Sequence, residues 1–463
     1  MKFLQKNFQD TLFILFVGLL QGLALLAVHQ WMDHLQHPQQ YLSIIWILYA
    51  VLITAPLTLM VLVKQPRQKV IQLVAIFSLL VAGTAYYLGW VSDIGKVADV
   101  DGEKLTFGSV YIFGLSTAWF ISLAFFEHYC QHGKWATHYA TLFQASWRNL
   151  AKGVTATSFL GLFWLLLFLL STLLEMLGLN FFTNLISSSY FVYLATTLVL
   201  GLGLGLYDTT VGAKFDAHSS GLQVIGWLLP LASIILIAFV LILPFKGLGV
   251  LWDTGHASYI ILGLMGLMGL MGFMVFLLNA AFQDGRKPEY PDWILRLASM
   301  ASLTMPIYAA LLAYASFLRV QQYGWTVWRV WLSCLVLVVA IYALGYAKAG
   351  LASVARDKTW MSAIKTTNVL AATVVLALLL LLNTPLISPS RLAVISQVAE
   401  IMQSNLDEVH SYEMDDLRFR AGRYGLEAVE KMSRDNANPE LQKLAQSSLA
   451  KKVLTITPIM TRH

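Results

Sequence analysis

Residues 154–178 read VTATSFLGLFWLLLFLLSTLLEMLG, and Glu175 is the one charged residue among them. A helix that crosses about 30 Å of hydrocarbon needs roughly 20 mostly apolar residues. The stretch therefore predicts a membrane-spanning helix. It also argues against a transmembrane β-barrel, because barrel strands alternate apolar and polar residues over segments of about ten positions.

Comparable apolar stretches recur along most of the chain. Taken together they predict an all-α fold, a polytopic transmembrane helix bundle of about eleven spans that occupies residues 1–388. The expected spans lie near residues 11–29, 41–63, 70–91, 108–126, 154–178, 189–207, 222–244, 259–282, 293–316, 327–347 and 368–388.

The composition supports a membrane protein. Apolar residues make up 58% of the 463 residues and charged residues 12%, about half the charged share of soluble globular proteins. These values exclude a water-soluble enzyme and a disordered chain. The two cysteines, Cys130 and Cys334, lie too far apart in the sequence to form a CxxC metal or redox motif.

The basic residues predict how the chain is oriented. If the N-terminus is cytoplasmic, sixteen Lys and Arg fall in the inner segments and five in the outer loops, as the positive-inside rule requires. An odd number of spans then places the C-terminal tail outside. The net charge of +6 therefore reports orientation, and we expect no nucleic-acid partner.

Residues 389–463 differ from the rest of the chain, because ten basic and ten acidic residues balance one another. Leu392, Ile395, Val398 and Met402 recur at helical spacing, and Pro439 marks the start of a further helix. We expect a small helical extramembrane tail. A core of this size is marginal alone, so the tail should pack on the membrane domain or on a partner.

An aromatic series predicts an interfacial amphipathic helix near residues 133–152. Its aromatic residues would lie at the level of the lipid headgroups, with the basic residues on another face directed toward phosphates. The aromatic members are Trp135, Tyr139, Phe143 and Trp147, and the basic members include Lys134, Arg148 and Lys152.

His128 and His132, one helical turn apart, form a weak candidate metal site. The order Glu-His-x-x-x-His, however, is not the His-Glu-x-x-His motif of zinc metalloproteases. We therefore expect no metal and no cofactor. The sequence also has no phosphate-binding loop, nucleophile elbow or dinucleotide fingerprint.

Polar residues gather where predicted spans meet water, and two such clusters are the candidate sites. Arg in the outer cluster could hold a phosphate or a carboxylate, including Glu175 or an acid of the tail. The inner cluster consists of Asn279, Gln283 and Asp284, and the outer cluster of Arg319, Gln322, Tyr323 and Arg329.

Within the predicted spans, no paired acids and no mid-bilayer His occur. Since ion-coupled transporters normally use such groups, their absence argues against that class. The pairs Gly18–Gly22 and Gly201–Gly205 predict close helix packing inside the bundle. The repeat GLMGLMGLMG at residues 263–272 predicts flexible packing or, alternatively, a Met-lined path for lipid.

Several stretches together resemble one known family. They are LNAAFQDG at 278–285, MPIYAALLAY at 305–314, LRVQQYGWT at 318–326, NTPLISPSR at 383–391 and LRFRAGRYG at 417–425. The chain, best over residues 220–430, resembles a family of polytopic bacterial inner-membrane proteins catalogued as a domain of unknown function. The segment Arg-Val-Gln-Gln-Tyr-Gly is the most specific part. The resemblance implies an inner-membrane location and supplies no catalytic residues.

These observations favour a non-catalytic protein of the cell envelope, transport-like or scaffolding, that handles lipid or lipid-linked material. Its expected partners are membrane lipids and other envelope proteins. A groove open to the membrane that reaches both polar clusters would support this hypothesis, and a sealed bundle would exclude it.

Two alternatives remain open. The first is a membrane-embedded glycosyltransferase-like enzyme that acts on lipid-linked sugars. It requires Asp99, Asp101 or Glu103 to line a cavity with Arg319 or Arg329. The second is a pure interaction protein that acts through the tail.

Overall fold

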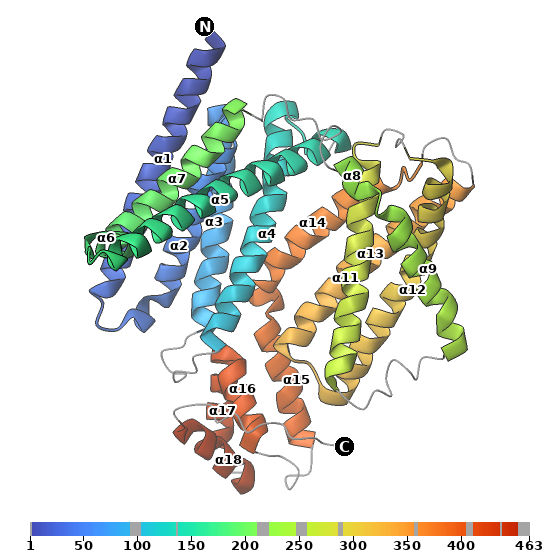
Figure 1. The fold of residues 1–463 in the computed structure, drawn as a ribbon. Helices are drawn as coiled ribbons and strands as arrows, with labels where there is room; N and C mark the ends of the chain where they lie inside the picture. The colour runs from blue at the N-terminus through green and yellow to red at the C-terminus, as the bar shows by residue number, and fades with distance from the viewer. Residues whose placement is uncertain are drawn as a thin grey trace.

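The chain folds as a bundle of helices (Figure 1). The computed structural model describes residues 2–92, 103–135, 138–210, 222–246, 257–285, 290–355, 360–403, 411–435 and 438–451. In these ranges every regular element is helical, and ten helices are long and apolar enough to cross a membrane. The prediction of an all-α, multi-pass membrane protein is confirmed.

The N-terminal half of the bundle comprises the helices from α1 to α7. They are α1 (Lys2–Asp33), α2 (Leu42–Val61), α3 (Arg67–Val91), α4 (Glu103–His132), α5 (Tyr139–Met176), the short α6 (Phe181–Ser187) and α7 (Ser189–Thr210), with a 3₁₀ turn, η1 (Pro38–Tyr41), before α2.

The C-terminal half and the tail follow. The half comprises α8 (Leu222–Gly226), α9 (Leu229–Lys246), α11 (Ala257–Phe282), α12 (Asp292–Tyr323), α13 (Val327–Val354) and α14 (Ile364–Leu382). A 3₁₀ turn, η2 (Pro385–Ile387), leads into the tail helices α15 (Pro389–Gln403), α16 (Ser411–Arg420), α17 (Gly422–Ser433) and α18 (Pro439–Ala450).

The span expected at residues 222–244 is divided into α8 and α9. Pro230 lies in the first turn of α9, where proline is tolerated because its missing N–H needs no partner there. The 18 residues of α9 cover about 27 Å, close to the thickness of the hydrocarbon. Figure 1 shows the N-terminus and the tail helices α16–α18 at opposite ends of the bundle.

Each half has its own apolar core. In the N-terminal half, α2, α3 and α4 pack around residues such as Phe77 and Leu123, while Ile14 and Leu204 belong to a neighbouring cluster between α1 and α7. The larger core of the C-terminal half joins α9, α11, α12, α13 and α14. Helices α4 and α14 pack against each other and connect the two halves.

The glycine pairs of α1 and α7 make close contacts, as predicted. A Cβ atom at Gly22 would lie 2.5 Å from Thr197 Oγ1, and one at Gly201 would contact Ile14 at 3.4 Å. The repeat in α11 behaves differently. Cβ atoms at Gly266 and Gly269 would meet nothing within 4 Å in the described structure. These two glycines of the repeat therefore do not bring neighbouring helices closer.

The tail has a small core of its own and docks on the bundle. Met414, Leu417 and Val429 are fully buried within it. The Arg423 guanidinium lies 4.6 Å from the centre of the Trp90 ring, and the hydroxyl groups of Tyr424 and Tyr87 are 3.4 Å apart. The tail is therefore fixed to the end of α3.

Candidate functional site

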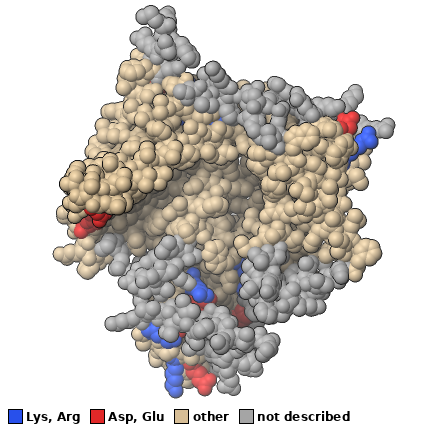
Figure 2. All heavy atoms as spheres, in the orientation of Figure 1, with Lys and Arg blue, Asp and Glu red and all other residues tan. Residues whose placement is uncertain are grey.

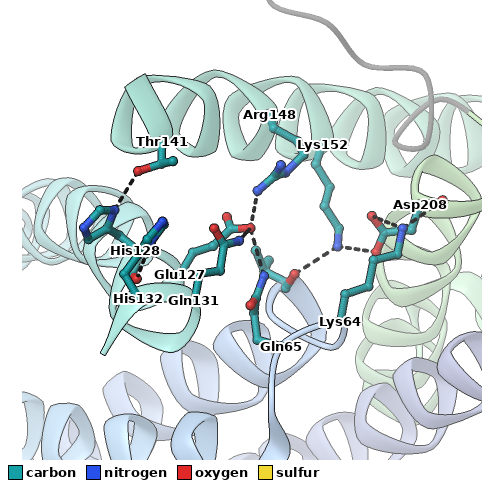
Figure 3. A network of polar contacts seen from close by, with 11 residues as sticks. Lys64, Gln65, Glu127, His128, Gln131, His132, Thr141, Arg148, Lys152 and Asp208 are labelled. Carbon is teal, nitrogen blue, oxygen red and sulfur yellow. Dashed lines mark hydrogen bonds and ion pairs between the residues drawn. The ribbon is translucent and has the colours of Figure 1, made fainter. Parts of the chain in front are cut away.

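A charged network joins α4, α5, α7 and the turn that follows α2 (Figure 3). The Lys152 side chain is only 3% exposed, and its Nζ donates hydrogen bonds to Asp208 Oδ2 at 2.6 Å and to the Val61 carbonyl at 3.1 Å. Lys64 approaches the same carboxylate at 3.6 Å from a more exposed position. Asp208 thus lies between two lysines.

Glu127 forms the second half of this network (Figure 3). Its carboxylate accepts hydrogen bonds from the side-chain amides of Gln65 at 3.0 Å and Gln131 at 3.2 Å, and it pairs with Arg148. Buried charges are stable only when paired and hydrogen-bonded in this way. Because each described charge of the network has a partner, the network can hold the helices together but offers no vacant site for a ligand.

Sequence reasoning missed these ion pairs. Arg148 and Lys152 are one turn apart on α5, while their acidic partners Glu127 and Asp208 come from α4 and α7. The one available signal was the positive-inside imbalance, which placed the basic groups at this end. It did not identify the carboxylates that face them.

The weak metal candidates lie beside this network. His128 is buried, and its Nδ1 is 2.7 Å from the Thr141 hydroxyl. The rings of His128 and His132 stack with their centres 4.5 Å apart, and His132 Nδ1 is 3.2 Å from the His128 carbonyl. Stacked rings do not direct their nitrogens to one point. Within the described ranges no cluster of three potential metal ligands forms.

The predicted interfacial helix corresponds to the first part of α5, which begins at Tyr139, and Phe143 and Trp147 of its aromatic face contact protein where lipid headgroups were expected. Phe143 is buried against Ala280 and Leu222, and Trp147 packs on Phe276. The physical reason is that α11 supplies a complementary apolar surface. The basic residues of this segment, Arg148 and Lys152, likewise meet protein carboxylates.

The inner polar cluster is only partly assembled. Asn279 joins an uncharged network in which its Nδ2 donates to the Tyr346 hydroxyl at 2.7 Å, and Asn368 Nδ2 donates to Asn279 Oδ1 at 2.6 Å and to Tyr139 at 2.8 Å. These residues link α5 to α11, α13 and α14. Gln283 is buried with a positive φ of 50° in the turn after α11, where Asp284 also lies.

The outer cluster is divided between the end of α12 and the start of α13. Arg329 Nη1 donates to the Gly324 carbonyl at 2.7 Å, and Thr326 caps α13. Gln322 is exposed and Tyr323 ends α12, one turn after Arg319. Glu175 lies exposed near the end of α5, which Figure 1 places on the opposite side of the molecule.

The pairing of an outer Arg with Glu175 is therefore wrong. Of the two carboxylate sources considered, the tail is the one that the structure brings close. Burial raises the pKa of Asp416 on α16, and the charge of Arg329 opposes this rise. Arg420 also opposes this rise from 2.7 Å away.

A cavity of about 430 Å³ lies at this end of the bundle, between the tail helices α15 and α16 and the helices α3, α4, α13 and α14. Tyr87, Tyr111, Trp328 and Trp331 supply aromatic surface. None of the residues of the predicted outer or inner cluster is among the described lining of the cavity, although Thr326, between Tyr323 and Arg329 in the sequence, does line it. The volume falls within the range of small-molecule sites in proteins, roughly 300–1,000 Å³.

Several polar groups of the cavity are fixed by the local fold. Ser388 caps α15, with its Oγ 3.4 Å from the backbone N–H of Arg391, and Asn383 Nδ2 donates to the Leu379 carbonyl at 2.8 Å. Ser390 is 3% exposed and lines the cavity beside Gln397. In the part of the chain that the structure describes, neither of these two side chains has a hydrogen-bond partner.

A hollow in the surface shares two helices with the cavity. Figure 2 shows the surface recessed between α5 and α11, over α4 and α14, with no charged atoms visible in the recess. Phe113 of α4 is 75% exposed and Leu380 of α14 is 37% exposed. Since α4 and α14 also form walls of the cavity, apolar surface and cavity share two helices.

The residues on which the enzyme alternative depends cannot be placed at the cavity. Asp99 and Asp101 lie outside the described residues, and so does the side chain of Glu103, although α4 begins there. Among the described residues that line the cavity, the charged ones are Asp416 and Arg420. Neither Arg319 nor Arg329 is among them.

Comparisons with known proteins give no further assignment. No protein-family model, no curated protein and no solved structure matches this chain.

Proposed function

We propose that this chain is an inner-membrane protein of the cell envelope that binds a membrane amphiphile, a lipid or lipid-linked molecule, in the cavity beneath its tail. The observation that carries the proposal is the composition of the cavity. Aromatic side chains from the bundle and hydrogen-bonding side chains such as Ser390 and Gln397 meet there in about 430 Å³. An amphiphile matches both kinds of surface.

The hollow supports entry from the membrane. Its floor, α4 and α14, carries exposed apolar side chains, and the same two helices contribute Tyr111 and Leu382 to the lining of the cavity. A lipid chain could lie on this floor while its headgroup occupies the cavity. The two halves on either side pack through separate cores, an arrangement that is compatible with transport-like movement of one half against the other.

The tail and the cavity lie on the outer side of the inner membrane in this proposal. Three features support this orientation: the sixteen-to-five imbalance of basic residues, the position of the N-terminus and the tail at opposite ends of the bundle, and the resemblance to bacterial inner-membrane proteins. The ligand would therefore be bound at the outer leaflet, with the tail as its cover.

Site-specific photo-crosslinking in intact membranes tests the proposal. A photoreactive amino acid is placed at Gln397 in the cavity, at Gln446 in the tail away from the cavity, and at Leu165, which is exposed on α5. Position 397 should yield lipid adducts enriched in one class, position 165 the bulk lipid mixture, and position 446 none. Absence of adducts at 397, or the bulk mixture there, would contradict the proposal.

A further inference from the structure

We infer that the cavity recognises an uncharged, hydroxyl-rich headgroup, so that its ligand is a sugar-bearing amphiphile of the glycolipid class. This inference rests on the proposed function and names the chemistry of its ligand. Three properties of the described lining carry it: the kind of hydrogen-bonding groups, the balance of charge, and the aromatic surface.

The hydrogen-bonding groups match hydroxyls. Ser and Thr hydroxyls and Asn and Gln amides can each donate and accept hydrogen bonds, as ligand hydroxyls also do. Thr326, Asn383, Ser390 and Gln397 present such groups from α13, α14 and α15. Ser390 carries the most weight, because a hydroxyl in a residue that is 97% buried, with no described protein partner, would gain from a partner on the ligand.

Among the described lining residues, one acidic and one basic side chain balance each other. Asp416 and Arg420 are one turn apart on α16, with Arg420 Nη1 2.7 Å from Asp416 Oδ1. A phosphate is recognised best by several cationic donors, but Arg420 is the one arginine among the described lining residues and already holds a carboxylate, while Arg329 acts on the same carboxylate from outside the lining. A cationic headgroup would face the reverse problem, because the same arginine would repel it. A neutral headgroup avoids both conflicts.

The aromatic side chains suit a sugar ring. One face of a pyranose presents C–H groups, which pack against the flat apolar surface of an aromatic ring. Trp328 and Trp331 lie one turn apart on α13, and Tyr87 and Tyr111 face the cavity from α3 and α4. Tyr and Trp combine such a surface with a hydrogen-bonding group. Aromatic walls with convergent polar groups are the usual composition of a selective small-molecule site.

The test uses the full chain in phosphatidylcholine nanodiscs with a photoactivatable dodecyl maltoside. After irradiation, labelled peptides are identified by mass spectrometry. We expect labels on residues 326–331 and 388–397, and we expect unlabelled dodecyl maltoside to compete about tenfold better than dodecyl phosphate or dodecylphosphocholine, the discrimination that one or two hydrogen bonds provide.

Matched variants test the residues that carry the inference. Ser390→Val and Gln397→Ala should each lower labelling of these peptides about tenfold. Ser447→Val and Gln446→Ala make the same changes on α18, away from the cavity, and should leave labelling unchanged. Thermal unfolding of each purified variant shows whether the fold is retained, and Gln397→Glu, which keeps the size but adds a charge, should also lower labelling.

The outcomes separate the inference from the proposed function. If dodecyl phosphate or dodecylphosphocholine competes better than the maltoside, the sugar class is wrong while the cavity remains an amphiphile site. If cavity peptides are not labelled and none of the three compounds competes, the proposed function fails as well. Equal loss of labelling in the control variants would also overturn the inference, because the effect would not come from the cavity.

Discussion

Replacing Asp208 by Asn tests the charged network most sharply. The change removes the carboxylate that faces the Lys152 ammonium at 2.6 Å and leaves the Val61 carbonyl, at 3.1 Å, as the neutral partner of that ammonium. Removing one partner of a buried ion pair typically destabilises a protein by 3–5 kcal/mol. Since Asn can still accept one hydrogen bond from Lys152, we expect a value near the lower limit, about 3 kcal/mol.

Lys64 provides a matched control on the same carboxylate. Its side chain is 42% exposed and its Nζ lies 3.6 Å from Asp208 Oδ1, so Lys64→Met should destabilise by no more than about 1 kcal/mol. The double variant Lys152→Met with Asp208→Leu should recover most of the loss, because well-packed apolar residues can replace a buried ion pair at little cost.

The assay is equilibrium unfolding of the purified chain in mixed micelles, followed by far-ultraviolet circular dichroism. Wild type, the single variants and the double variant are compared under one set of conditions. If Asp208→Asn and Lys64→Met destabilise equally, by less than about 1 kcal/mol, the Lys152–Asp208 pair does not have the buried character that the structure gives it. The conclusion that the charged network holds α4, α5 and α7 together would then be refuted.

Three further predictions concern the tail. Gly422→Ala should lower the stability of the docked tail by about 1–3 kcal/mol, because Gly422 has a φ of 61° and a Cβ there would collide with the Val91 carbonyl. We expect faster proteolysis of the tail in this variant, and an unchanged rate would contradict the prediction. Burial raises the pKa of Asp416, while Arg420 and Arg329 oppose the rise. The folded state then binds the proton more tightly than the unfolded state, so the stability of the tail should fall as the pH rises from about 4 through the raised pKa. Proteolysis of the tail measured over this pH range should lose its pH dependence in Asp416→Asn. If the dependence persists in the variant, another group is responsible for it. An alkaline phosphatase fused at Pro389 should be active, and inactivity would place the tail in the cytoplasm.

Most of the bundle could be predicted from apolar length alone. The stretch 154–178 became part of α5, and the expected spans near residues 41–63 and 70–91 correspond to α2 and α3. The exception at residues 222–244 follows from local chemistry, because Pro230 is suited to the first turn of a helix and α9 begins at the residue before it. Pro56, by contrast, lies within α2 without ending it.

The candidate site was harder to predict, because it depends on contacts between residues that are distant in the sequence. Thr326 and Trp328, next to the predicted outer cluster, line the same cavity as Arg420 only because the tail folds back onto the bundle. Hydrophobic periodicity indicates that α16 is helical, but it does not indicate which surface the helix covers. Similarly, no sequence signal related Asp208 to Lys152, whose partnership depends on how α5 crosses α7.

An experimental density map of the chain in native-lipid particles would show directly whether an amphiphile occupies the cavity. We expect elongated density that begins between Trp328 and Gln397 and continues over α4 and α14 into the hollow. A cavity filled by side chains, or one holding only separate water-sized features with no connection to the hollow, would contradict the claim that this protein binds a membrane amphiphile beneath its tail.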